Sequence, residues 1–203
     1  LKAESGEIIA GEDTPGGIEV RGPNVFTEYW GKPAATAECF EPDGWFRTGD
    51  MAVRETGYYR IMGRLSIDII KSGGYKLSAL EIEAVLLDHP LIAECAVIGV
   101  ADDLKGQVPL GFLVLKAGVD RPHGEIVNDV VTMVRDRIGP VAFFKSALVV
   151  QRLPKTRSGK ILRGTMQKIA DSQTWTMPAT IEDPVVLDEI KDGLRDAGFA
   201  AKG

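Results

Sequence analysis

A short basic stretch, residues 153–163, contains the groups that an anion-binding loop needs. Its cationic residues are Lys155, Arg157, Lys160 and Arg163, although the whole chain has a formal net charge of −5. Ammonium and guanidinium groups bind phosphate and carboxylate oxygens through charge-assisted hydrogen bonds. The stretch therefore predicts a site for an anionic substrate, with an ordinary solvent-exposed basic loop as the alternative.

The residues that flank Lys160 predict a turn that leads into a helix. Pro154 ends the preceding apolar run, and Ser158-Gly159 supplies a flexible turn. The apolar pattern restarts with a helix at Ile161. We therefore expect Lys160 at a junction where backbone N–H groups and its own ammonium converge on one anion.

Three strings in the chain resemble adenylate-forming enzymes, the acyl-CoA synthetases and their relatives. They are residues 153–163, the run Trp-Phe-Arg-Thr-Gly-Asp at 45–50, and Ile-Ile-Lys-Ser-Gly-Gly-Tyr-Lys-Leu-Ser-Ala-Leu-Glu-Ile-Glu at 69–83. The last string is similar to malonyl-CoA synthetases, whereas residues 138–184 look more like propionyl- and acetyl-CoA synthetases. The resemblance implies an acid–thiol ligase that joins a carboxylate to coenzyme A by way of an acyl-adenylate, with ATP, Mg²⁺ and coenzyme A as cofactors.

The resemblance implies that four residues contact the nucleotide. Lys160 matches the catalytic lysine, which stabilises charge as the carboxylate attacks the α-phosphate of ATP. Asp50 matches an aspartate that accepts hydrogen bonds from the ribose hydroxyls, although its position also suits a turn-capping aspartate. Arg64 and Lys76 match residues that reach the nucleotide phosphates.

Coenzyme A contacts are implied at Gly73, Gly74 and Arg135. A backbone without side chains lets the pantetheine arm pass closely, although paired glycines are also typical of a hairpin turn. Arg135 matches an arginine that binds coenzyme A phosphate, and a solvent-facing helix arginine is the alternative. Ser66 is the expected hinge between two domains, with Asp68 as its rival because this stretch is longer than the common pattern.

A backbone cation site is implied at Leu87, His89 and Ile92 by some acetate-type relatives, but the spacing does not demand it. His89 and His123 are isolated histidines, which are typical of core or surface positions. No metal site follows from the residues themselves.

The pattern of apolar residues predicts an α/β (α+β) fold. We expect a strand-rich segment, with a turn at Gly16-Gly17 and a strand that ends at Asp50. Helices are expected at 78–87, where Ser78 and Glu81 form a capping box, around 126–138 and over 184–198. Strands at 92–100 and 109–115 are expected to pair. The predicted division is 1–65, the end of a large AMP-binding domain; 66–170, a small C-terminal domain; and 171–203, an extension.

Composition excludes several classes of protein. Of the 203 residues, 44% are hydrophobic and 26% are charged, which is typical of a globular protein. The acidic balance argues against nucleic acid as a partner, and no apolar run is long enough to predict a membrane span. Two widely spaced cysteines favour a reducing compartment, the cytoplasm or the mitochondrial matrix.

Two motifs of the family are missing from the chain, the Gly-rich phosphate loop and the Tyr-Gly-x-Thr-Glu segment that binds adenine and magnesium. We therefore expect the carboxyl-terminal part of a short-chain acyl-CoA synthetase, whose partner is the N-terminal adenylating domain. The alternative is a stand-alone binding module that docks onto another protein. A peptide-synthetase adenylation domain is a weaker rival, because no carrier domain follows before Gly203.

Overall fold

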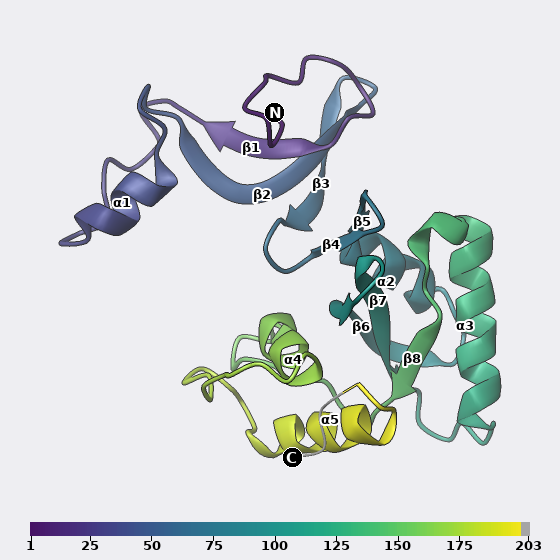
Figure 1. Cartoon of the computed structure of the whole chain (residues 1–203). Coiled ribbons are helices and arrows are strands. Elements are labelled where there is room, and N and C mark those ends of the chain that lie inside the picture. The colour runs from purple at the N-terminus through teal and green to yellow at the C-terminus, as the bar shows by residue number, and fades with distance from the viewer. Residues whose placement is uncertain (200–203) are drawn as a thin grey trace. The chain divides into compact units, whose positions relative to one another are not determined.

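The computed structural model describes residues 1–199, which form two compact units. The first unit ends at Ser66 and the second begins at Ile67. Both mix strands with helices, which confirms the α/β class (Figure 1). Residues 200–203 of the expected extension lie outside the described residues.

The first unit is an antiparallel sheet in the order β1-β2-β3 with one short helix. Its elements are β1 (Gly16–Val20), α1 (Pro33–Cys39), β2 (Phe46–Glu55) and β3 (Tyr58–Arg64). Two expectations are wrong here. Gly16-Gly17 opens β1 instead of forming a turn. The close packing of Ile9 accounts for the glycine at residue 16, because a Cβ there would lie 2.6 Å from the Ile9 side chain. Asp50 lies inside β2 and does not end it.

The second unit is built on a mixed sheet in which β5, β4, β7 and β6 follow one another and β8 joins β7 in parallel. Its strands are β4 (Ile69–Ser72), β5 (Tyr75–Ser78), β6 (Ile92–Asp102), β7 (Gly106–Leu115) and β8 (Ser146–Val149). Strands β6 and β7 pair antiparallel over their whole length, which confirms the expected pairing.

Helices cover both faces of this sheet (Figure 1). They are α2 (Ala79–Leu87), α3 (His123–Arg137), α4 (Arg163–Ala170) and α5 (Val185–Asp196), with a 3-10 turn at Pro140–Ala142. Successive residues of a strand point to opposite faces, so Ala96 and Ile98 pack with α4 and α5 while Cys95 and Val97 pack with α2 and α3. Each face therefore has its own hydrophobic core.

The expected helices are present, with adjusted ends. Ser78 accepts a hydrogen bond from the Glu81 N–H at the start of α2, as predicted for the cap. Helix α4 begins at Arg163, two residues later than the apolar pattern suggested, because Ile161 is held in a β-bridge with Lys155.

Candidate functional site

Lys160 lies on a tight hairpin, residues 155–161, which we call the lysine hairpin. The Thr156 N–H donates to the Lys160 carbonyl at 2.8 Å, and the Lys160 N–H donates to the Thr156 hydroxyl at 3.0 Å. Gly159 takes a φ of +82° in the turn, a conformation that glycine adopts without strain. Lys160 is exposed, so the hairpin fixes its backbone while its ammonium faces solvent.

The neighbouring Lys155 differs from Lys160 in its surroundings. Its ammonium lies 2.7 Å from a Glu94 carboxylate oxygen on β6. An ammonium that already has a carboxylate partner is less available to a substrate anion. Of the two lysines on the hairpin, Lys160 is therefore the better candidate for substrate binding.

Arg163 lies two residues beyond the lysine hairpin and anchors this part of the chain to the rest of the unit. Its guanidinium binds both carboxylate oxygens of Glu83 on α2, at 3.0 and 2.7 Å, and Glu83 also accepts the Val97 N–H at 2.7 Å. Because Glu83 is buried, this pair is shielded from water. Sequence reasoning missed this anchor; a glutamate on the core-facing side of the helix at 78–87 was its signal.

Asp50 and Arg64 are brought together in the first unit. They are direct partners across β2 and β3, and the Arg64 Nε lies 3.3 Å from an Asp50 carboxylate oxygen. The Asp50 N–H donates to the Thr48 hydroxyl. Both side chains stay partly exposed, so the pair forms a small polar surface at which the carboxylate can accept further hydrogen bonds.

Gly73 and Gly74 form the two-residue turn between β4 and β5. Their φ angles of +56° and +87° are those of a type I′ hairpin, which supports the turn interpretation. A Cβ on Gly74 would meet nothing within 4 Å. The space beside Gly74 is open, so passage of the pantetheine arm at this turn stays a proposal. Lys76 lies on β5, two residues beyond the turn, and is half-buried.

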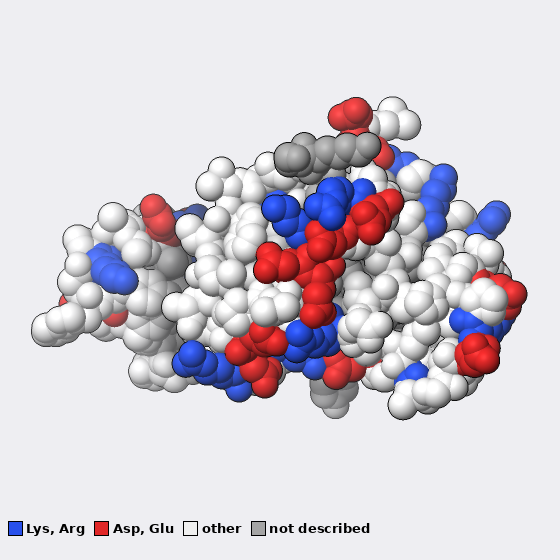
Figure 2. Space-filling view, turned by 90° about the horizontal axis from the view of Figure 1, so that it is seen from below, with Lys and Arg blue, Asp and Glu red and all other residues white. Residues whose placement is uncertain are grey.

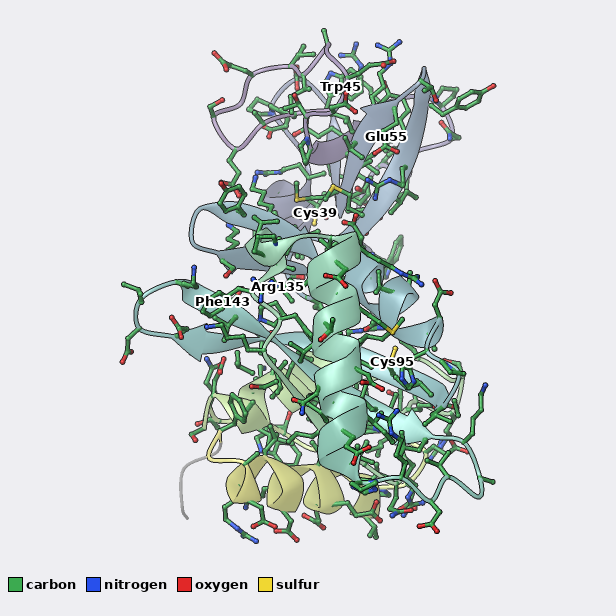
Figure 3. All side chains as sticks on the ribbon, turned by 90° about the vertical axis from the view of Figure 1, so that its right-hand side faces the viewer. Cys39, Trp45, Glu55, Cys95, Arg135 and Phe143 are labelled. Carbon is green, nitrogen blue, oxygen red and sulfur yellow. The ribbon has the colours of Figure 1, made fainter. Side chains whose placement is uncertain are left out.

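Arg135 lines a pocket of about 300 Å³ on the face of the sheet that α3 covers. Phe143 and Lys145 share this pocket, and Figure 3 shows Arg135 and Phe143 side by side. The ring of Phe143 contacts two ammonium groups, that of Lys105 at 4.2 Å and that of Lys145 at 4.0 Å from its centroid. Sequence reasoning found Arg135 but missed these lysines, since they come from separate loops. The pocket combines apolar walls with positive charge.

The two hinge candidates differ in their contacts. Ser66 is exposed and stands at the boundary between the two units. Asp68 belongs to the second unit, where its carbonyl accepts the Ala79 N–H and its carboxylate lies 4.0 Å from Arg163. A residue held in this way is a poor pivot, so the contacts favour Ser66.

The expected cation site at Leu87, His89 and Ile92 gains no support from the side chains. The His89 carbonyl already accepts the Ile92 N–H at 3.1 Å, while the buried imidazole accepts the Leu91 N–H and lies 3.7 Å from Asp129. Within residues 1–199, no three His, Cys, Asp or Glu side chains converge as metal ligands. The backbone site therefore stays a prediction.

Residues 81–160, a segment that ends at Lys160, match the family model of the AMP-binding enzyme C-terminal domain. The chain carries the C-terminal domain of an AMP-binding enzyme. The matched segment lies in the second unit and contains residues 155–160 of the lysine hairpin, the residues that line the pocket at Arg135, and strands β6, β7 and β8. Comparison with known proteins extends the likeness beyond the matched segment.

Curated relatives of the chain include proteins named as malonate–CoA ligases and acetyl-coenzyme A synthetase. The chain is 45% identical over 157 residues to the mitochondrial malonate–CoA ligase of Mus musculus, covering 77% of the chain and 26% of the ligase. It is 40% identical over 200 residues to the acetyl-coenzyme A synthetase of Penicillium chrysogenum, covering 95% and 29%. The chain thus spans about a quarter of the length of these relatives.

A solved structure shares the fold. The crystal structure of ATP-bound MatB from Rhodopseudomonas palustris superposes with a TM-score of 0.71 at 28% identity, covering 82% of this chain and 32% of that one. The structural likeness covers more of the chain than residues 81–160, the segment that matches the family model. Among the described residues, no helix is both long and apolar enough to cross a membrane.

Proposed function

We propose that the chain supplies the carboxyl-terminal part of an ATP-dependent short-chain acyl-CoA synthetase. The reaction joins a carboxylate to ATP, which yields an acyl-adenylate and pyrophosphate, and then transfers the acyl group to coenzyme A with release of AMP. One observation carries the proposal: the two groups of candidate residues in the second unit lie on opposite faces of one sheet. The lysine hairpin packs with the α4 and α5 core, and the Arg135 pocket borders the α2 and α3 core.

In the first step, Lys160 supplies the positive charge. A carboxylate that approaches a triphosphate is repelled, and an ammonium between them lowers that repulsion most in the transition state. Asp50 would accept hydrogen bonds from the ribose hydroxyls, and Arg64 would contact phosphate beside it. Lys76 would add a second phosphate contact. Mg²⁺ supplies further charge neutralisation when bound, with ligands mostly outside this chain.

In the second step, the other face of the sheet would serve coenzyme A. The turn at Gly73 and Gly74 would let the pantetheine arm pass, and Arg135 would bind a coenzyme A phosphate. One domain that uses two faces in turn has to rotate against its partner, which is the role proposed for Ser66. A cytoplasmic or mitochondrial location suits the two free cysteines, Cys39 and Cys95.

A hybrid enzyme tests this proposal. In the hybrid, this chain replaces the matched 200 residues of the Penicillium chrysogenum acetyl-coenzyme A synthetase, to which it is 40% identical. We expect the folded hybrid to catalyse acetate-dependent exchange of pyrophosphate into ATP and to form acetyl-CoA. The unaltered synthetase is the positive control, and the 203-residue chain alone should show no exchange.

Two results would contradict the proposal. Exchange by the chain alone would show that it contains a complete adenylating site. A hybrid that melts cooperatively but forms neither acyl-adenylate nor thioester would favour the alternative, a binding module without a catalytic role.

A further inference from the structure

A segment near the C-terminus, residues 178–183, pairs with the lysine hairpin as an additional strand. Thr156 and Ile181 form an antiparallel bridge. The Arg157 N–H donates to the Thr180 carbonyl at 3.0 Å, and the Glu182 N–H donates to the Lys155 carbonyl at 2.9 Å. Since Lys155 also bridges Ile161, residues 155–157 are the middle strand of a three-stranded ribbon, with Lys160 on the strand opposite Ile181.

The same segment is firmly attached to the body of the second unit. Ile181 is buried in the core that α4 and α5 share, beside Val186 and Leu187. Because the lysine hairpin bonds to this segment, the position of the hairpin depends on how α5 packs. In Figure 1, α5 lies along the side of the unit that carries α4.

A group of ion pairs reinforces the attachment next to the hairpin. Arg152, just before the hairpin, donates to Asp183 at 2.6 Å and to Glu189 on α5 at 2.9 Å. The hydrogen bond that Arg152 donates to Glu189 is the main cause that raises the pKa of Arg152. Figure 2, which views the molecule from the α5 side, shows acidic and basic side chains intermingled across the middle of this face. These ion pairs join the segment at Asp183 to α5 and to the residue that precedes the hairpin, in addition to the buried contact of Ile181.

We propose that residues 178–183, which we call the C-terminal latch, position the lysine hairpin for the adenylation step. This inference rests on the proposed function, in which Lys160 stabilises the charge of the adenylation transition state. A two-stranded hairpin of seven residues is marginal by itself in water, and a third strand anchored in the core restricts its motion. Ile181 and the Glu182 N–H are thus positioning groups that act through the backbone of Lys155 to Arg157.

Glu182 allows a sharp test, because its side chain is exposed while its N–H bonds to Lys155. Glu182→Pro removes the N–H, and Glu182→Ala removes only the side chain. In the 203-residue chain, we expect Glu182→Pro to speed hydrogen exchange at the Arg157 amide by about 10-fold or more. Glu182→Ala should leave it unchanged.

The hybrid enzyme gives the catalytic readout. We expect Glu182→Pro to lower the adenylation rate by about 10–100-fold, since a small displacement of a catalytic group is costly. Thioester formation from pre-made acetyl-AMP should match that of Glu182→Ala. Ile181→Ala, which keeps both backbone bonds but loosens the anchor, should show a smaller effect in the same direction and serves if the proline variant does not fold.

Each contrary result has a separate meaning. The latch would be overturned if Glu182→Pro and Glu182→Ala showed the same hydrogen exchange at the Arg157 amide and the same adenylation rate. It would also be overturned if Glu182→Pro sped hydrogen exchange at this amide but left adenylation unchanged. A joint fall of both half-reactions and of the melting temperature would show that the segment serves only the fold. If the parent hybrid is inactive, the proposed function fails, while the exchange experiment still decides whether residues 178–183 hold the hairpin.

Discussion

Arg64 and Asp50 form an ion pair across neighbouring strands, with 3.3 Å between the Arg64 Nε and an Asp50 carboxylate oxygen. The arginine orients the carboxylate without covering it, since about a third of the Asp50 side chain remains accessible (35%). A fixed, partly exposed acceptor next to a guanidinium is suited to a ribose and its phosphate. We therefore expect Asp50 to contact the nucleotide.

Asp50→Ala in the hybrid should raise the KM for ATP by about 10–100-fold, because a hydrogen bond to a charged group is lost. Glu55→Ala is the matched control, since Glu55 lies on the same strand and pairs with Arg60 at 2.8 Å. The hydrogen bond with Arg60 lowers the pKa of Glu55, so the control removes an ionised carboxylate from the same strand. Steady-state kinetics at varied ATP compare the two, and equal KM values would refute a nucleotide contact at Asp50.

Lys160→Ala should lower the rate of adenylation by about 10²–10³-fold, the typical loss for one charge-stabilising group. Thioester formation from pre-made acyl-AMP should fall far less. Lys155→Ala is the control from the same hairpin, because Lys155 is paired with Glu94. The two half-reactions are measured separately in the hybrid. Equal loss in both would mean that Lys160 has a structural role.

Gly74→Leu should block transfer to coenzyme A while adenylation continues. Part of any effect comes from backbone strain, because Gly74 has a φ of +87°. Gly74→Ala imposes the same strain with little bulk, so the difference between the two variants isolates the clash with the pantetheine. Thermal melts of both variants complete the measurement. Similar activities in the two variants, with similarly lowered melting temperatures, would mean that the glycine serves only the hairpin.

Stability should fall at high pH because of Cys95. Burial is the largest cause that raises the pKa of its thiol, from an ordinary value of 9.0 to about 12. The unfolded chain therefore loses this proton at lower pH than the folded chain does, so stability is retained below pH 9 and lost as the pH rises towards 12. Urea unfolding of the chain across this range should give a shallower decline for Cys95→Ala than for Cys39→Ala. If the free energy of unfolding fell equally with pH in the two variants, Cys95 would not be the cause of the decline.

Local features of the fold could be predicted from the sequence because their causes lie within a few residues. The cap formed by Ser78 and Glu81 involves residues three positions apart, and the spacing of Ile126, Val130 and Val134 places one face of α3 in the core. The turn before Lys160 was recognisable for the same reason, since Ser158 and Gly159 are adjacent turn residues. The β-bridge that makes this turn a hairpin was not predicted.

Only the tertiary structure decided which distant segments meet. Nothing near Ile181 in the sequence indicates that it bridges Thr156, and Arg163 reaches Glu83 across a separation of 80 residues. Gly16 was misread as a turn because the side chain that requires a glycine there, Ile9, comes from another segment packed against it. Such contacts depend on how the whole chain closes around its cores. The sequence by itself determined the candidate residues, and the packing of α5 and α2 determined how the most important of them, Lys160, is held in place.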